Sequence, residues 1–408
     1  MSQNYNPLKF TYKEKKIFFY AFALCAFWGL AIIPKYDVFV LILSLPLFIS
    51  FLNNKHKKLV FKKYIILLGI ALLANVIASY INRGQAPYWS LRTAYMTNFL
   101  PLLFYFYLAN NKTQIESIEN IIGSLYIIFC ICYITQYAIL PYIIFTPLNF
   151  TESETRFRMY GQTIVILGYF FSLNKYILTR RNLYLLYCFL GVCIFIMLGF
   201  RSMLLSLLIC TVFMFYRTTK ITFKSLLSFL LLSTIFIFTL YQFDFTKNTI
   251  EAIINRSQEQ NFQNEDYIRI QEFEYFTQEH FINISDFIFG SGFPSEQSAY
   301  GKYMLRLQQY NQYGEYVASV GAWFDWGLLG LSWVAGIPTV VILLIISAKA
   351  IFKKTDKQYY YFSFFYLFLI LSSITTIEFY RGGAFVFHAI ALYGIELCTL
   401  KKKKQYDT

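Results

Sequence analysis

The chain has 408 residues, of which 57% are hydrophobic, 21% are aromatic and only 14% are charged. Because a water-soluble protein carries roughly a quarter charged residues, this composition excludes an ordinary globular protein. The formal charge of +14 comes mostly from short Lys-rich segments between apolar blocks. That pattern argues against a nucleic-acid partner and is typical of the cytoplasmic side of a membrane protein.

The apolar residues form blocks of about 15 to 23 residues, long enough to cross a hydrocarbon layer of about 30 Å as helices. Helices are required because each unpaired backbone group in lipid costs several kcal/mol. The sequence therefore predicts an all-α polytopic membrane protein with about twelve spans. In chain order the predicted spans are Ile17–Ile33, Val38–Leu52, Tyr64–Ile81, Trp89–Leu108, Ile118–Leu140, Gly161–Leu178, Leu183–Gly199, Ser202–Tyr216, Phe223–Tyr241, Gly327–Ile346, Tyr359–Ile377 and Ala384–Leu400.

The apolar stretch from Leu183 to Tyr216 is divided into two spans, because one helix of that length would be about 50 Å long. A division at Gly199-Phe200-Arg201 places every later Lys cluster in the cytoplasm, together with both termini. The predicted organisation has three parts. Residues 1–243 hold nine spans, 244–326 form an extracytoplasmic loop with amphipathic helices, and 327–408 hold three spans and a Lys-rich cytoplasmic tail.

Arginine and lysine separate across this predicted topology. The inner segments carry 21 Lys and 3 Arg, whereas the outer segments carry 3 Lys and 9 Arg. Sorting of positive charge toward the cytoplasm explains the lysines but not the predominance of Arg outside. The arginines either pair with acidic residues or lipid headgroups, or form a ring of planar donors suited to an anionic lipid head such as a pyrophosphate.

The long polar segment from about Asp244 to Glu315 holds half of the acidic residues. Within it, Asp266 to Phe281 has helical periodicity, and Arg269 and His280 are expected on nearly one face, about three turns apart. After Gly290-Ser291-Gly292 we expect an interfacial helix rich in Tyr and Gln.

Residues able to carry chemistry concentrate on the predicted outer face. They are Arg156 and Arg158 before the sixth span, Arg201 at the turn, Arg269 and His280 in the loop, Asp325 before the tenth span, and Glu378 with Arg381 between the last two spans. The sequence lacks metal-ligand spacing and a glycine-rich phosphate loop, so no metal and no cofactor are expected.

The spans themselves hold few ionisable groups, which argues against an ion-coupled transporter. His388 and Glu396 lie in the last span. Both are expected to be structural, with Glu396 close enough to the cytoplasmic end to reach the interface.

Four sequence motifs occur in a fixed order. They are Arg158-Met159-Tyr160-Gly161, Leu198-Gly199-Phe200-Arg201-Ser202-Met203-Leu204-Leu205, Asp266-Tyr267-Ile268-Arg269 followed by Phe289-Gly290-Ser291-Gly292, and Trp326-Gly327-Leu328-Leu329-Gly330-Leu331. In order, spacing and topology they resemble the O-antigen polymerase and O-antigen ligase superfamily of bacterial envelope glycosyltransferases.

The resemblance implies a class C glycosyltransferase-like fold in the bacterial inner membrane and a substrate of undecaprenyl-pyrophosphate-linked oligosaccharide. It implies that Arg201 and Arg269 contact the donor pyrophosphate, with Arg158 as a further candidate. Membrane lipids and a chain-length regulator protein are the other partners it suggests for lipopolysaccharide or other surface polysaccharide biosynthesis.

Ligases of this superfamily carry a His in the loop before the Gly-Leu-x-Gly span. Here that neighbourhood, Tyr313-Gly314-Glu315-Tyr316-Val317-Ala318-Ser319, has no His, which favours a polymerase. The acceptor-activating residue stays open among His280, Glu315, Asp325 and Glu378. The alternatives are a ligase that transfers polymer to lipid A core and, from another class, a flippase for lipid-linked oligosaccharide.

Overall fold

The computed structural model describes residues 11–25, 36–54, 59–139, 142, 144–145, 159–219, 268–310, 316–319 and 321–406. The predicted ninth span, Phe223–Tyr241, and the candidate residues Arg156, Arg158 and Glu315 lie outside these residues. The number of spans and the three-part division of the chain therefore stay predictions.

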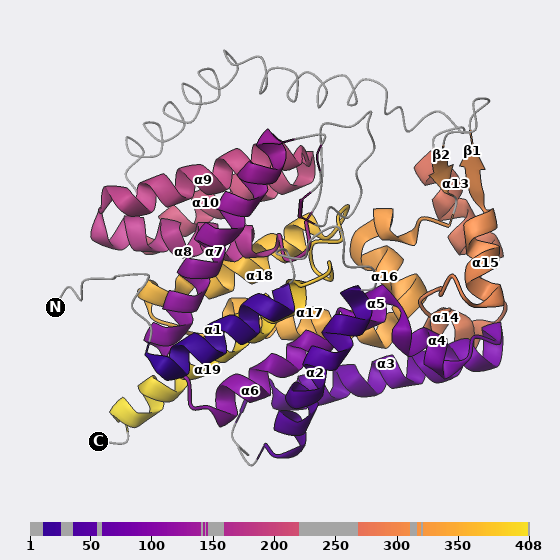
Figure 1. Ribbon diagram of the computed structural model, residues 1–408, viewed down its shortest axis with the longest axis horizontal. Coiled ribbons are helices and arrows are strands. Elements are labelled where there is room, and N and C mark those ends of the chain that lie inside the picture. The colour runs from indigo at the N-terminus through magenta and orange to yellow at the C-terminus, as the bar shows by residue number, and fades with distance from the viewer. Residues whose placement is uncertain are drawn as a thin grey trace.

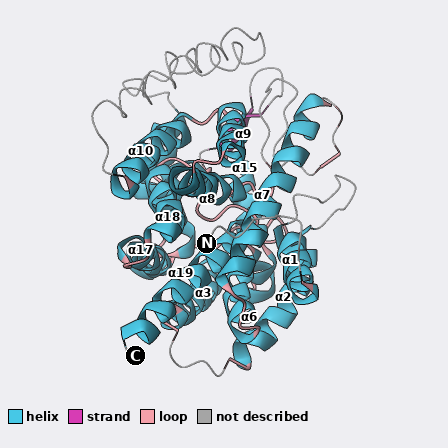
Figure 2. Ribbon diagram, turned by 90° about the vertical axis from the view of Figure 1, so that its left-hand side faces the viewer, coloured by secondary structure: helices cyan, strands magenta, loops and turns pink. Residues whose placement is uncertain are grey.

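Nearly every described element is a helix (Figures 1 and 2). The first half contains α1 (Tyr12–Cys25), α2 (Tyr36–Leu52), α3 (Lys62–Arg83), α4 (Pro87–Arg92), α5 (Ala94–Thr97), η1 (Leu100–Leu103), α6 (Phe104–Asn110), α7 (Ile115–Ala138), α8 (Ile164–Thr179), α9 (Asn182–Leu198) and α10 (Arg201–Thr218). The second half contains α13 (Ile268–Glu274), η2 (Tyr275–Glu279), α14 (Ile284–Phe289), α15 (Ala299–Arg306), β1 (Gln308–Tyr310), β2 (Tyr316–Ser319), η3 (Trp323–Trp326), α16 (Gly327–Ala335), α17 (Ile337–Phe352), η4 (Lys357–Tyr359), α18 (Tyr360–Ser372) and α19 (Ala384–Tyr406).

Three of the described helices, α3, α7 and α10, are long and apolar enough to cross a membrane. Five shorter apolar helices lie in α2, α8, α9, α17 and α19. The predicted division of the stretch Leu183–Tyr216 is confirmed, because α9 ends at Leu198 and α10 begins at Arg201. Gly199 makes this turn possible with a left-handed φ of 67°, which most L-residues adopt only at a cost.

The prediction of one continuous helix over Trp89–Leu108 was wrong. The chain here forms α4, α5, η1 and α6, which are four short helices. At Thr93 the backbone is extended, and its side-chain oxygen accepts from Met96 N at 3.3 Å and donates to the Ser90 carbonyl at 2.9 Å. Pro101 then opens η1, because proline cannot donate the backbone hydrogen bond of a helix interior.

The prediction of one helix over Gly327–Ile346 was also wrong. It is divided at Gly336 into α16 and α17. Gly336 has φ 87° and ψ 154°, a conformation that is almost restricted to glycine. Pro338 lies in the first turn of α17, where a missing backbone N–H costs little. Local hydrophobicity alone did not reveal either break.

The loop elements α13, α14 and α15 gather at the right of Figure 1, opposite the C-terminal end of α19 that carries Lys401–Lys404. The helix predicted over Asp266–Phe281 is present as α13, but η2 is a π-helical turn. Because a π turn adds a residue, the expected common face of Arg269 and His280 is lost. The expected Tyr- and Gln-rich helix was partly wrong, since after α15 the chain forms an antiparallel pair of strands.

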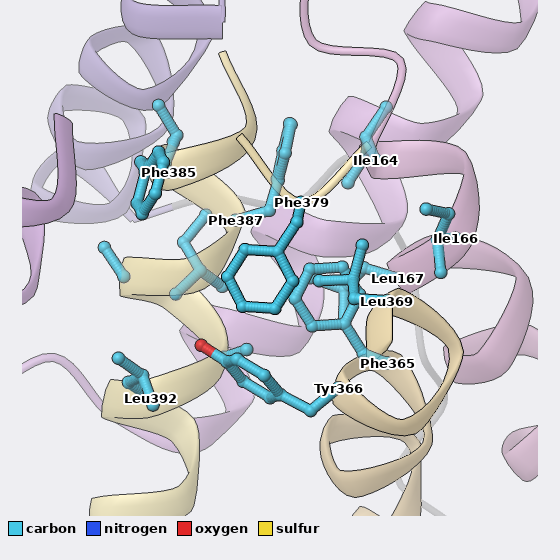
Figure 3. Close-up of a cluster of buried hydrophobic side chains, with 14 of the residues drawn as sticks. Ile164, Ile166, Leu167, Phe365, Tyr366, Leu369, Phe379, Phe385, Phe387 and Leu392 are labelled. Atoms are coloured by element: carbon cyan, nitrogen blue, oxygen red, sulfur yellow. The ribbon is translucent and has the colours of Figure 1, made fainter. Parts of the chain in front are cut away.

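Aromatic and aliphatic side chains of α8, α18 and α19 pack together in one part of the core (Figure 3). His388 lies within it: its Nδ1 is 3.0 Å from the Tyr366 hydroxyl and its Nε2 is 2.9 Å from the Phe379 carbonyl. This confirms a structural histidine.

The expectation that Glu396 reaches the interface was wrong. Its side chain is buried, and Oε1 accepts from Phe61 N at 2.9 Å and from the Tyr105 hydroxyl at 2.7 Å. Phe61 precedes α3, so the carboxylate lies at the N-terminus of that helix, where negative charge is favoured.

Candidate functional site

The predicted Glu378–Arg381 pair lies in the connection between α18 and α19 and is fully buried. Arg381 Nε donates to Glu378 Oε1 at 2.7 Å, and the two side chains are 3% and 0% exposed. Gln162 Nε2, just before α8, donates to the same oxygen at 2.6 Å. Among the described residues, Glu378 Oε2 has no hydrogen-bond partner. The pair thus retains an unused acceptor atom.

A second polar group surrounds Glu272 of α13. Its carboxyl is buried, and Oε2 accepts from Trp326 Nε1 at 3.1 Å. Burial, together with the nearby carboxylate of Asp325, raises the pKa of Glu272 to about 9, although Arg269 acts in the opposite direction. Desolvation disfavours the charged form, so Glu272 is protonated at neutral pH. Arg269 and Asp325, which are both partly exposed, are the charged neighbours of this neutral carboxyl.

Tyr380 lies between these two groups. Its hydroxyl donates to the Gly327 carbonyl at 3.1 Å, and its ring stacks on Trp323 with 5.8 Å between centroids. Burial raises the pKa of the Tyr380 phenol, on which Arg381 and Asp325 also act electrostatically. The structure therefore brings Arg269, Asp325, Glu378 and Arg381 into one region. We call it the outer polar site after the side on which the sequence predicts these residues.

Arg201 is exposed at the first residue of α10. α10 packs against α18, and α18 leads to Glu378. Arg201 therefore lies on a helix that neighbours the outer polar site. The roles assigned to all these residues from the sequence stay predictions.

His280 does not join this site. It is buried among Tyr275, Phe276 and Phe281, and its Nδ1 is 3.1 Å from the Tyr275 hydroxyl. Burial, with a smaller contribution from Arg83, lowers the pKa of His280 to about 3. Its imidazole is therefore neutral at physiological pH and packed among aromatic side chains, apart from the outer polar site.

Sequence reasoning missed several residues that hold this end of the molecule together. Arg83 forms a buried ion pair with Asp286 and donates to the His280 carbonyl, which attaches the loop to the end of α3. Glu272 had a usable signal, because it lies one helical turn after Arg269. Asn75 also had one, as a polar residue inside an apolar span. Nothing in the sequence signalled the pairing of Arg83 with Asp286, which are far apart in the chain.

Within the described residues, no group of three or more His, Cys, Asp or Glu side chains is placed to hold a metal ion. A scan of known protein families finds none whose model matches the chain, and a search of curated proteins finds no match. Fold and composition define a class: a helical protein with helices suited to crossing a membrane and a cluster of partly and fully buried polar side chains.

The raised pKa of Glu272 predicts a pH-dependent stability. The folded state retains a proton that the unfolded state loses between pH 4.5 and about 9, so this stabilising contribution is present at low pH and lost as the pH rises through that window. In the wild type the free energy of unfolding should therefore fall with rising pH, by at most about 1.4 kcal/mol per pH unit. We expect Glu272→Gln to remove this decline.

Thermal unfolding of the detergent-solubilised protein across this pH range tests the prediction. Glu274→Gln, a change at an exposed position of the same helix, is the matched control and should leave the decline in place. An equal decline in the wild type and Glu272→Gln would show that Glu272 is ionised when folded.

Proposed function

We propose that the chain is a surface-polysaccharide polymerase of the bacterial inner membrane. It joins undecaprenyl-pyrophosphate-linked repeat units at the outer face, on a multi-span fold of the class C glycosyltransferase type. The observation that carries this proposal is the outer polar site, in which Arg269 and Arg381 lie beside carboxyl groups at one end of a helical bundle. Guanidinium groups suit a diphosphate because they offer planar pairs of donors.

The glycines of the polymerase-like motifs support a backbone conformation shared with that superfamily. Gly161, Gly199, Gly290, Gly292 and Gly327 all have positive φ. Gly161 N also donates to the Gly382 carbonyl at 2.8 Å, which joins the start of α8 to the connection that carries Arg381. The turns at Gly161 and Gly327 therefore adjoin the connection that carries Glu378 and Arg381.

In the proposed reaction an acceptor sugar hydroxyl attacks the anomeric carbon of the donor glycan. The new glycosidic C–O bond forms as the bond to the pyrophosphate oxygen breaks, and undecaprenyl pyrophosphate leaves. Arg269 and Arg201 stabilise the charge that develops on the leaving phosphate. Asp325, which is partly exposed beside neutral Glu272, accepts the hydroxyl proton. No metal takes part in this proposed mechanism.

Substitution of the proposed phosphate-binding arginines should abolish polymer while leaving the protein level normal. We expect Arg201→Ala and Arg269→Ala to lose polymer, and Arg201→Lys to fail as well, because Lys lacks the bidentate fork. Arg306→Ala, an exposed arginine at the end of α15, is the matched control and should keep wild-type polymer. Gel analysis of surface glycans in a complemented deletion strain provides the measurement. Full polymer from the Arg201→Ala/Arg269→Ala double variant would contradict the proposal.

The same deletion strain separates the alternatives. Loss of a polymerase leaves lipid A core capped with a single repeat unit. Loss of a ligase leaves bare core with polymer stranded on the lipid carrier, and loss of a flippase leaves bare core without polymer.

A further inference from the structure

The loop segment from Asn283 to Ser298 descends along α3 and returns. At the outer end of α3, Asn82 accepts from Asn283 Nδ2 at 3.0 Å and donates to Ser285 Oγ at 3.2 Å. About two turns deeper, Asn75 Nδ2 donates to the Phe289 carbonyl at 2.7 Å and to the Gly290 carbonyl at 3.2 Å. The first leg of the loop therefore follows α3 inward.

The returning leg is held at the outer end again. Gln85 Nε2, just after α3, donates to the Phe293 carbonyl at 2.8 Å. Gln85 Oε1 accepts from Ser295 N at 3.0 Å and from Ser298 Oγ at 2.8 Å. The first leg thus begins, and the second leg ends, beside the C-terminus of α3. The apex between the two legs is at Gly290-Ser291-Gly292.

The apex lies at membrane depth. α3 has 22 residues and is about 33 Å long, close to the thickness of a hydrocarbon core. The apex, beside Asn75, is roughly 10 Å below the outer end of α3. The break at Gly336 lies at the same level, because a Cβ on Gly290 would be 2.4 Å from Gly336 N.

Irregular backbone inside a bilayer requires internal hydrogen bonds, and the apex has them. Ser291 N donates to the Trp333 carbonyl at 3.0 Å, and Gly292 N donates to the Val334 carbonyl at 2.9 Å. Asn75 Nδ2 also donates to the Val334 carbonyl, at 2.7 Å. One amide therefore caps the C-terminal ends of both α14 and α16.

The outward side of α14 is apolar. Ile284, Phe287 and Ile288 are 77%, 46% and 38% exposed. α14 packs against α3 and α17 (Figure 1). Those neighbours also expose apolar residues, including Ile77 and Ile81 of α3. Water would disfavour such a surface, whereas the acyl chains that face α3 would cover it.

We propose that residues 283–298 form a re-entrant segment that enters the outer leaflet, with the exposed face of α14 in contact with phospholipid acyl chains. The segment is polar where it crosses the end of α3 and apolar along α14. Its lipid contact does not depend on the polymerase proposal.

Photoactivatable phospholipid in nanodiscs tests this with the wild-type protein, because adducts can be located by fragment mass spectrometry. We expect adducts on Ile284, Phe287 and Ile288 at a yield similar to that on Ile77 of α3. Glu296 and Gln297, which are exposed on the returning leg, serve as internal controls and should carry several-fold fewer adducts. Labelling of α3 without labelling of α14 would overturn the proposal, as would equal labelling of α14 and the two controls.

Discussion

Arg381→Ala is expected to lower the free energy of unfolding by about 3–5 kcal/mol, because it leaves a buried carboxylate without its counter-charge. Glu378 is 0% exposed, and its Oε2 already lacks a partner among the described residues. The remaining partner of Oε1, the amide of Gln162, is neutral. Thermal unfolding in detergent, followed by tryptophan fluorescence, measures the loss.

The double variant Glu378→Gln/Arg381→Met separates folding from function. Because it removes both charges and retains similar volumes, we expect it to regain most of the stability that Arg381→Ala loses and to unfold near the wild-type temperature. If Arg381 also binds the substrate, this variant should fold and still make no polymer. Arg306→Ala, which changes an exposed arginine, should unfold like the wild type. An Arg381→Ala protein as stable as the wild type would show that the pair is not buried together.

Gly336→Ala is expected to prevent accumulation of folded protein. The backbone of Gly336, at φ 87° and ψ 154°, is strained for any residue with a Cβ. That Cβ would also lie 2.4 Å from the Phe289 carbonyl oxygen, and the backbone of α14 is held there by Asn75. Neither side of this contact has room to move, so the break between α16 and α17 would be displaced.

Gly69→Ala is the matched control for this substitution. Gly69 lies on an exposed face of α3, and no heavy atom lies within 4 Å of a Cβ added there. Alanine in a helix interior is favoured over glycine by up to about 1 kcal/mol, so this variant should be as stable as the wild type or more so. Size-exclusion chromatography of membrane extracts compares the two. Monodisperse Gly336→Ala protein in normal yield would contradict the described contact.

The sequence predicted helices well where local composition alone forms them. α3, α7 and α10 match predicted spans closely, since an apolar block of membrane length has no alternative structure in lipid. The turn before Arg201 was predicted from charge placement and then confirmed. The break at Gly336 was missed because it depends on close contacts with Phe289, a residue distant in the chain. The break at Thr93 was missed because it depends on the hydrogen bonds of one side chain to Ser90 and Met96, which hydrophobicity does not reveal.

The candidate site was predicted unevenly for a related reason. Glu378 and Arg381 are one helical turn apart in sequence, so their pairing was visible from spacing. Glu272 was overlooked because a carboxyl in a polar loop looks solvated until its burial beside Trp326 is known. His280 was read as a loop residue, whereas packing against Phe276 and Tyr275 makes it a core residue.

By itself the amino-acid sequence determined that this is a helical protein with segments suited to crossing a membrane and with lysines concentrated on one side of its predicted topology. Those properties follow from hydrophobicity and charge summed over short segments. Only the tertiary structure decided that α3 holds the loop at Asn75 and Arg83, and that Arg269, Asp325 and Arg381 share one region. Such contacts join residues far apart in the chain, and their energies depend on burial, which no local pattern of residues encodes.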